Sequence, residues 1–499
     1  MRIGFRVDSS MEIGGGHVSR CLSLAAELEV RGFDIVFFCR ILSGDFTDKI
    51  KSRHHCVTFE SQNPSEIDHE AEIALIATYI KEEGTLDWLI IDHYAVTQEW
   101  ETAAGRIADK IFVIDDFVNR SHACDIYLNQ SMANLTDEQA DRINSVSFLL
   151  GASYALLDRN ISSYRVSKRG GPKKIYSMVI DFGSYNNFEV FTNVIETVKS
   201  LERDDLQIEA EVMLGRNEQL LRLLKQKFNG VKGLNFHSFT TNYLQILANC
   251  DVAIGSCGVT SLERCCLGIP SFVIPIVDNQ LLLLDMLVQN ECVKLVGGLD
   301  YIDVPLLRSG LSDYVNDGID QNWSESCKKI VDGEGVRRVA DILTVSRSTP
   351  VKLRRAEEAD AFILFEWKNE RAARKYSIIQ DKLEFVSHKR WLLGRLKDEG
   401  SQLFILETQN EIPLGQIRFD YKELGWELSY SIDSKYRNNG LGKKIIQMGL
   451  ESLTSPAPYV VYGRVTKNNQ ISNKIFNALD FTCETQGTDI LVYKKEYSL

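Results

Sequence analysis

The chain opens with an apolar strand, a glycine-rich turn and a helix in direct succession. Residues 3–7 have the composition of a buried strand, residues 14–16 are consecutive glycines, and residues 18–28 carry the apolar spacing of a helix. A strand that leads through a short turn into a helix is typical of a parallel sheet with crossover helices. His17 therefore stands where the helix begins. Backbone N–H groups there can approach an anion, and an imidazole can accept a proton near pH 7.

The alternation of strand and helix continues to about residue 150. Short apolar runs follow one another, among them residues 88–92 and 111–115, with helical or polar stretches between them. Both runs end in acidic residues, Asp92 and Asp115-Asp116. Open α/β sheets bind ligands at the carboxyl ends of their strands. We therefore expect these carboxylates to line the same cleft as His17.

Two breaks divide the chain into three predicted domains. Gly170-Gly171-Pro172 ends the first series of strands, and a second α/β series begins after it. Residues 345–350 read as a linker, and beyond it runs such as 426–432 alternate like antiparallel strands. The fold class is therefore predicted as α/β, with two Rossmann-like domains and a C-terminal α+β domain. The predicted boundaries are 1–168, 169–345 and 350–499.

Composition excludes several classes of protein. The formal net charge is −12, and the absence of a block rich in Lys and Arg argues against nucleic-acid binding. The eleven cysteines form no CxxC pair, so we expect reduced core thiols and no metal. No signal peptide or apolar run of membrane-spanning length is recognisable, which favours a cytoplasmic protein without membrane contact.

The second predicted domain carries a nucleotide-type turn. Gly255, Ser256 and Gly258 follow a strand and open a helix, where N–H groups and a hydroxyl can contact a diphosphate, and Glu263 can reach ribose hydroxyls. This pattern, followed by Gly-Ile-Pro, an apolar strand and Asn279-Gln280, resembles the UDP-sugar site of two-domain glycosyltransferases of the B fold. The resemblance implies that Glu263 holds the ribose.

The N-terminal motifs narrow the resemblance. The residues from Phe5 to His17, together with Ile90–Tyr94, Ile114–Asp116 and Ser153–Leu157, resemble UDP-2,4-diacetamido-2,4,6-trideoxy-β-L-altropyranose hydrolase of pseudaminic acid biosynthesis. The resemblance spans roughly residues 1–340 and implies that His17 helps water attack the anomeric carbon as UDP leaves. We expect Asp8, Asp92 and His93 to orient His17 or the sugar. The remaining expected substrate contacts are Gly14, Gly15, Gly16, Arg20, Tyr94, Gly255, Ser256, Gly258, Ser261, Glu263, Asn279 and Gln280.

The resemblance fails at one loop. Such hydrolases carry Gly-Gly-x-Asp after the first strand of the second domain, whereas this chain has Phe-Gly-Ser-Tyr-Asn-Asn at 182–187. One glycine is kept and the acid is missing. The departure affects how this loop would contact phosphate or sugar, but not the class of reaction.

The C-terminal domain has a second phosphate-type turn. A strand at 426–432 precedes Arg437-Asn-Asn-Gly-Leu-Gly442, whose successive amides can wrap a pyrophosphate before a helix. This turn and the later Asn469–Phe481 segment resemble the acetyl-CoA motifs of GNAT-type N-acetyltransferases, which implies acetyl-CoA as cosubstrate. The expected acetyl-CoA contacts are Leu428, Ile432, Arg437, Asn438, Asn439, Gly440, Leu441, Gly442, Lys443, Asn469, Ser472 and Phe476.

This segment also departs from its family. The usual tyrosine that protonates the leaving thiolate is Phe476, and a usual glycine is Asp480. Phe476 has no proton to donate, so another hydroxyl, with Tyr462 and Tyr493 as candidates, or solvent must serve. Glu427 is the candidate base that takes a proton from the substrate ammonium.

The two resemblances describe consecutive reactions. Acetylation of a 4-amino group on a UDP-linked trideoxy sugar gives the diacetamido sugar nucleotide that the hydrolase resemblance would cleave. The sequence therefore predicts a bifunctional enzyme whose partners are UDP-linked amino sugars and acetyl-CoA. One alternative is a UDP-sugar glycosyltransferase with an acetyltransferase for another amine. Another is a nucleotide-sugar-binding module beside a protein-acetylating domain, and the stereochemistry of the hexose stays open.

Overall fold

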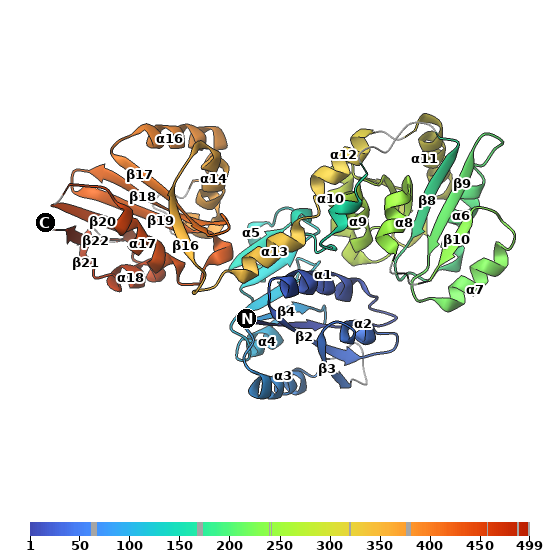
Figure 1. The fold of residues 1–499 in the computed structure, drawn as a ribbon, viewed down its shortest axis with the longest axis horizontal. Coiled ribbons are helices and arrows are strands. Elements are labelled where there is room, and N and C mark those ends of the chain that lie inside the picture. The colour runs from blue at the N-terminus through green and yellow to red at the C-terminus, as the bar shows by residue number, and fades with distance from the viewer. Residues whose placement is uncertain are drawn as a thin grey trace. The chain divides into compact units, whose positions relative to one another are not determined.

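The computed structural model describes residues 1–60, 67–166, 173–238, 240, 242–318, 321–375, 381–456, 458–486 and 489–497. They form two compact units, Met1–Ala340 and Asp341–Leu499 (Figure 1). The predicted break at Gly170-Gly171-Pro172 lies outside the described residues. No helix in the described ranges is long and apolar enough to cross a membrane.

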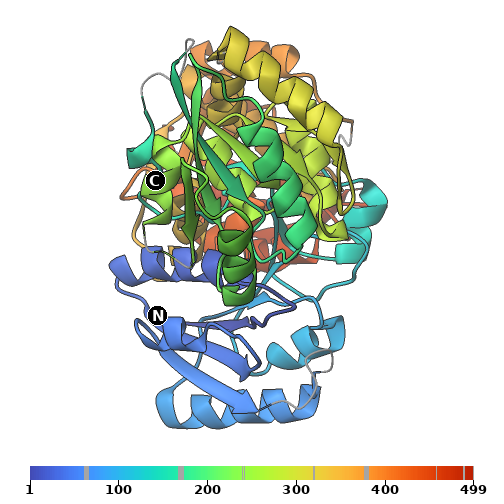
Figure 2. The same ribbon diagram turned by 90° about the vertical axis from the view of Figure 1, so that its right-hand side faces the viewer.

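The first sheet of the N-terminal unit is parallel throughout. Its order is β3 (His55–Glu60), β2 (Asp34–Ile41), β1 (Arg2–Val7), β4 (Trp88–Asp92), β5 (Ile111–Ile114), β6 (Ile126–Asn129) and β7 (Ser147–Leu150). Helix α1 (Gly16–Val30) covers one face and α3 (His69–Glu83) the other (Figure 2). The shorter helices are α2 (Thr47–Lys51), α4 (Gln98–Ala104) and α5 (Asp137–Ile143). Chain order reverses between β1 and β4, and their carboxyl ends lie side by side there.

The second sheet of this unit is also parallel. Its order is β10 (Leu234–His237), β9 (Gln207–Met213), β8 (Ile175–Asp181), β11 (Val252–Ser256), β12 (Ser271–Ile274) and β13 (Val293–Leu295). Its helices are α6 (Phe188–Lys199), α7 (Glu218–Lys227), α8 (Tyr243–Asn249), α9 (Val259–Leu267), α10 (Leu281–Gln289), α11 (Val304–Asp317) and α12 (Gln321–Ile330). The next helix, α13 (Gly335–Thr344), returns to the first part of the unit, where Arg338 donates to the Ser153 carbonyl. A small ladder pairs β14 (Gly297–Gly298) with β15 (Tyr301–Ile302). The α/β class is confirmed, whereas the assignment to Rossmann-like domains of the glycosyltransferase-B type stays a prediction.

The third sheet belongs to the C-terminal unit and is mostly antiparallel. Its order is β16 (Val351–Arg355), β17 (Ser401–Thr408), β18 (Pro413–Lys422), β19 (Gly425–Ile432), β20 (Tyr459–Thr466), β22 (Ile490–Tyr497) and β21 (Thr482–Gln486). The helices are α14 (Ala361–Asn369), α15 (Arg371–Lys375), α16 (Phe385–Lys397), α17 (Leu441–Ser452) and α18 (Gln470–Asn477). A 3-10 turn at Glu358–Asp360 leads into α14.

One strand pair of the third sheet is unusual. Strands β19 and β20 run parallel and pair only at Trp426↔Val461 and Glu427↔Tyr462. Beyond these two pairs the register ends, although both strands continue. The antiparallel pattern predicted from sequence is therefore interrupted at β19 and β20, beside the start of α17.

Gly255 shows how tightly the second sheet is built. A Cβ at this position would lie 1.8 Å from the Asp181 carbonyl oxygen of the neighbouring strand β8. We expect Gly255→Ala to lower the free energy of unfolding of the N-terminal unit by about 3 kcal/mol. Gly298→Ala is the matched control, because a Cβ there meets nothing within 4 Å. Guanidinium unfolding followed by circular dichroism measures both, and equal midpoints would contradict the packing argument.

Candidate active sites

His17 is held by a buried carboxylate. It is the second residue of α1, and its Nδ1 lies 2.6 Å from Oδ1 of Asp92 at the end of β4. Burial alone would raise the pKa of Asp92, but the charge of Arg20 and the hydrogen bonds from Arg20 and His17 outweigh burial and hold this pKa well below its usual range. An ionised Asp92 therefore keeps the proton of a neutral His17 on Nδ1. Nε2 is left as the nitrogen that can accept a proton.

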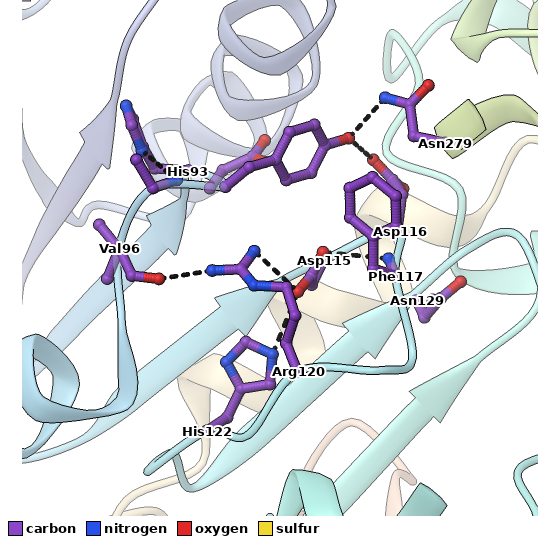
Figure 3. A network of polar contacts seen from close by, with 12 residues as sticks. His93, Val96, Asp115, Asp116, Phe117, Arg120, His122, Asn129 and Asn279 are labelled. Atoms are coloured by element: carbon purple, nitrogen blue, oxygen red, sulfur yellow. Dashed lines mark hydrogen bonds and ion pairs between the residues drawn. The ribbon is translucent and has the colours of Figure 1, made fainter. Parts of the chain in front are cut away.

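Arg20 extends this contact to a second acid. Its Nε and Nη2 donate to Asp92 at 2.6 Å each, and its Nη1 donates to Asp116 at 2.9 Å. The Tyr94 hydroxyl donates to Asp116 and accepts from Asn279 at 2.9 Å (Figure 3). Burial and the Asp116 charge raise the pKa of Tyr94, so its hydroxyl stays protonated. Asp116, named among the strand-end acids but not among the site residues, thus joins the predicted residues Arg20, Tyr94 and Asn279.

Asp8 and His93 form a second buried pair. Asp8 accepts two bonds from Arg6 and two from Arg40, and His93 Nε2 lies 2.9 Å from Asp8 Oδ2. The Ala95 N–H donates to His93 Nδ1, which places the His93 proton on Nε2, toward Asp8. Of the residues expected to orient His17 or the sugar, Asp92 contacts His17, whereas Asp8 and His93 contact each other.

These groups line one cavity. Asp8, His17, Asp92, His93 and Tyr94, with Glu12, Ile13 and Ala95, surround a volume of about 210 Å³. The glycine turn before α1 directly follows the lining residue Ile13 and approaches the loop after β8 and helix α9. A Cβ on Gly14 would lie 3.0 Å from the Ser184 hydroxyl, and one on Gly16 would lie 4.0 Å from Val259 of α9.

The α9 turn presents a helix N-terminus, as predicted. Gly258 is the N-cap of α9, and no side chain caps its N–H groups. Glu263 lies further along α9 and is partly buried, and burial together with the Asp181 charge raises its pKa to about 8. Gln280 lies close to Gly258, and its side-chain oxygen accepts from the Ile276 N–H. The structure therefore brings Gly258 and Gln280 together and places Glu263 on the same helix.

Two predicted contacts of this turn have other partners. The Ser261 hydroxyl donates to the Ser256 carbonyl at 2.9 Å. Arg264, fully buried, donates through Nη2 to the Ser256 carbonyl and the Ser261 hydroxyl, at 2.6 Å each. Gly255 belongs to β11 rather than to the turn, and the need for glycine there comes from the contact with β8. Ser261 therefore stabilises the turn through a hydrogen bond within the protein, whereas Gly255 is required by the packing of β11 against β8.

Asp181 holds the start of the loop at 182–187, whose sequence departs from the pattern of the hydrolase family. The Gly183 N–H donates to Oδ1 of Asp181 at 2.8 Å, and Gly183 has a φ of 64°. Asn187 caps α6 by accepting from the N–H groups of Glu189 and Val190. The Tyr243 hydroxyl donates to the other Asp181 oxygen at 2.6 Å. An acid is thus present just before the loop, where its oxygens bind protein groups.

A further buried network lies beside the first site. His122 contacts Glu101 through Nδ1 at 2.8 Å. On its other side, His122 contacts Asp115 through Nε2 at 3.1 Å, and Arg120 donates to Asp115 and to the Val96 carbonyl (Figure 3). Burial alone would lower the pKa of His122, but Asp115 and Glu101 outweigh it and raise it to about 9. Sequence reasoning missed His122 and Glu101, because neither stands at the end of a strand.

The C-terminal turn fits a pyrophosphate. Asn438 and Gly440 both have positive φ, 63° and 70°, so that successive N–H groups curve toward one point at the start of α17. Gly440 is the N-cap without a side-chain cap, and Lys443 is exposed in the first turn. These features suit the diphosphate of coenzyme A. Acetyl-CoA, when bound, supplies the activated acetyl group.

Several predicted acetyl-CoA contacts have partners within the protein. Arg437 donates to Glu370 and to the Ile432 carbonyl. Asn469 accepts from the Ser472 N–H and so caps α18. The side chains of Leu428, Ile432, Leu441, Asn439 and Phe476 are buried.

The predicted base of the acetyltransferase is ion-paired. Glu427 Oε1 accepts from Nε of Arg464 at 2.6 Å, across β19 and β20. Tyr462 pairs with Glu427 in the parallel register and therefore shares its face of the sheet. Glu427 can take a proton from an amine only from within this ion pair.

The cysteines are largely core residues. Cys483 is exposed and Cys56 partly exposed, whereas the other cysteines are buried. Cys265, Cys292 and Cys327, distant in sequence, bring their sulfur atoms within 4.8 Å of one another. This cluster could not be predicted from the sequence, because its members come from α9, the loop after α10, and α12.

Comparison with known proteins identifies the C-terminal domain. Residues 351–482 match the family model of the acetyltransferase (GNAT) domain. Spermidine N-acetyltransferase from Vibrio cholerae, solved with CoA and spermine, is 16% identical and covers 29% of this chain and 95% of its own, with a TM-score of 0.26. The C-terminal part is thus a GNAT acetyltransferase domain whose cosubstrate is acetyl-CoA.

Other similarities extend over larger shares of the chain. An uncharacterized protein of Methanocaldococcus jannaschii is 22% identical over 98% of both chains. The UDP-2,4-diacetamido-2,4,6-trideoxy-β-L-altropyranose hydrolase of Campylobacter jejuni is 32% identical over 185 residues, which are 37% of this chain and 60% of the hydrolase. Acinetobacter baumannii MurG is 11% identical and covers 68% of this chain and 99% of its own, with a TM-score of 0.47.

The His122 network predicts a pH-dependent stability. The pKa of His122 is raised in the folded state, so its stabilisation is complete below about pH 6.5 and is lost as pH rises through about 9. We expect His122→Gln to cost up to about 3 kcal/mol at pH 6 and much less at pH 10. Urea unfolding at the two pH values measures this. An equal loss at both would show that the imidazolium charge contributes nothing.

Proposed function

We propose that the chain carries out two consecutive steps on one UDP-linked amino sugar. The GNAT domain acetylates the 4-amino group of a UDP-linked 2-acetamido-2,4,6-trideoxy sugar, and the N-terminal unit hydrolyses the resulting UDP-2,4-diacetamido sugar to UDP and free sugar. The observation that carries the proposal is the His17–Asp92 pair on the wall of the N-terminal cavity. The partial similarity to the Campylobacter jejuni hydrolase supports the substrate class.

The hydrolytic step needs a base and a place for the leaving group. His17 Nε2 takes a proton from water while the water oxygen attacks the anomeric carbon. The electron pair of the breaking carbon–oxygen bond leaves with UDP. Asp92 stabilises the imidazolium that forms, because its carboxylate bonds the opposite ring nitrogen. The uncapped N-terminus of α9 stabilises the charge on the diphosphate, and Glu263 is the candidate partner of the ribose hydroxyls.

His17 provides the direct test of the hydrolytic step. We expect His17→Asn to lower kcat for release of UDP from the diacetamido sugar nucleotide by roughly 10²–10⁴, the usual worth of a positioned general base, with UDP affinity almost unchanged. His55→Asn is the matched control, because His55 is exposed on β3. Assays contain no acceptor sugar. Full turnover by His17→Asn would remove it as the base, and no turnover by the wild type would favour a glycosyltransferase.

The full chain provides the test of coupling. Given the UDP-4-amino sugar, the wild type should release free sugar only when acetyl-CoA is present. Gly442→Asp places a carboxylate at the diphosphate turn, so it should abolish this release. The same variant should still hydrolyse the preformed diacetamido sugar nucleotide at the wild-type rate. Mass spectrometry of the products measures both reactions, and acetyl-CoA-independent release from the amino sugar would contradict the order of steps.

A further inference from the structure

The GNAT domain needs a proton donor that its sequence motif lacks. Transfer of the acetyl group to an amine leaves a thiolate, and protonation of its sulfur helps the carbon–sulfur bond to break. Phe476 stands at the motif position of the usual tyrosine, and it is buried with its ring stacked on Tyr493 at 5.1 Å. The ring fills the space over β20, because a Cβ on Gly463 would lie 2.6 Å from it.

The two tyrosines expected from sequence are poorly placed. Tyr493 lies flat against Phe476 and is 2% exposed, and its hydroxyl neighbours Cys483 and Asn477. Tyr462 shares the sheet face of Glu427. The diphosphate turn contacts the opposite face, because the nearest side chains to a Gly442 Cβ belong to Ile475 and to Tyr430, an odd number of residues from Glu427.

A third tyrosine, Tyr430, lies on the same face of the sheet as the diphosphate turn and contacts Phe476. Tyr430 lies on β19 where its pairing with β20 has ended, and its ring is 3.6 Å from the position of a Gly442 Cβ. Its hydroxyl lies 3.0 Å from the Ser472 hydroxyl of α18, and its ring packs edge-on against Phe476 at 6.3 Å. Tyr430 therefore spans from the start of α17 to α18. Burial raises the pKa of Tyr430, so the hydroxyl carries its proton at neutral pH.

We propose that Tyr430 is the proton donor of the acetyltransferase, with Ser472 as its positioning residue. As the amine nitrogen bonds to the acetyl carbon, the carbon–sulfur bond breaks and its electron pair stays on sulfur. Tyr430 Oη gives its proton to that sulfur. Ser472 Oγ passes a proton from solvent back to Tyr430, and the proton lost by the amine goes to solvent. This inference rests on acetyl transfer by the GNAT domain and is independent of which amine accepts the acetyl group.

The thiol of bound CoA provides a test that needs no acceptor. A hydroxyl that donates to sulfur stabilises the thiolate, so Tyr430→Phe should raise the thiol pKa of bound CoA by about one unit. The thiolate is measured by its ultraviolet absorbance in the full chain saturated with CoA. The absorbance of the same protein saturated with desulfo-CoA is subtracted at each pH. Tyr493→Phe and Tyr462→Phe are matched controls that should leave this pKa unchanged. Calorimetry should show CoA affinity within about twofold of wild type for all three, which verifies folding.

Activity measurements on Tyr430→Phe and thiol titrations of Ser472 variants complete the test. With the UDP-4-amino sugar, Tyr430→Phe should lower kcat by about 10² and leave the KM for acetyl-CoA unchanged. Ser472→Ala should give a smaller shift of the thiol pKa, and Ser472→Thr should restore it. An unchanged thiol pKa in Tyr430→Phe, or a shift in Tyr493→Phe, overturns the inference. If the wild type acetylates no sugar, the proposed acceptor is wrong, while the thiol titration still decides the role of Tyr430.

Discussion

The N-terminal site depends on one buried carboxylate. Asp92 ends β4 and accepts from His17 and Arg20, which stand three residues apart on one face of α1. The contact fixes the rotation of α1 over the sheet, the tautomer of His17 and the pairing of Arg20 with Asp116. Removal of Asp92 would leave a fully buried guanidinium with half of its partners, which is far more costly than the loss of one surface ion pair.

The strand order explains why these groups meet. Strands β1 and β4 are adjacent, with Val7 opposite Asp92, and chain order reverses there. Asp8 and His93, each one residue beyond this register pair, therefore meet at the same edge. Strand-end acids and a glycine turn before a helix are local signals, so the sequence predicted His17, Asp92 and Asp8 as neighbours. It left open which acid holds His17, because that depends on the rotation of α1.

Other features could not be predicted because they join distant segments. His122 lies outside any helix or strand and contacts Glu101 of α4, and the thiols of the cysteine cluster come from three segments. Tyr430 alternates with its neighbours on β19 like any half-buried strand residue. Its significance emerges only from the end of the β19–β20 register and from the distance to Ser472. Sequence motifs identify residues that lie in one turn, whereas these sites are formed by side chains from distant segments that come together only in the folded protein.

The chemistry of the N-terminal cavity also bears on the proposed order of steps. The two buried carboxylates on its wall are already paired, Asp8 with Arg6 and Arg40, and Asp92 with Arg20. A 4-ammonium group entering the cavity would find both buried acids already paired, and an ion pair with Glu12, the exposed carboxylate of the lining, would recover little of the hydration that the group loses. Acetylation turns that cation into a neutral amide, which needs only hydrogen bonds. Discrimination between the two sugars would then follow from the cost of desolvating the ammonium group, which favours the proposed order of acetylation before hydrolysis.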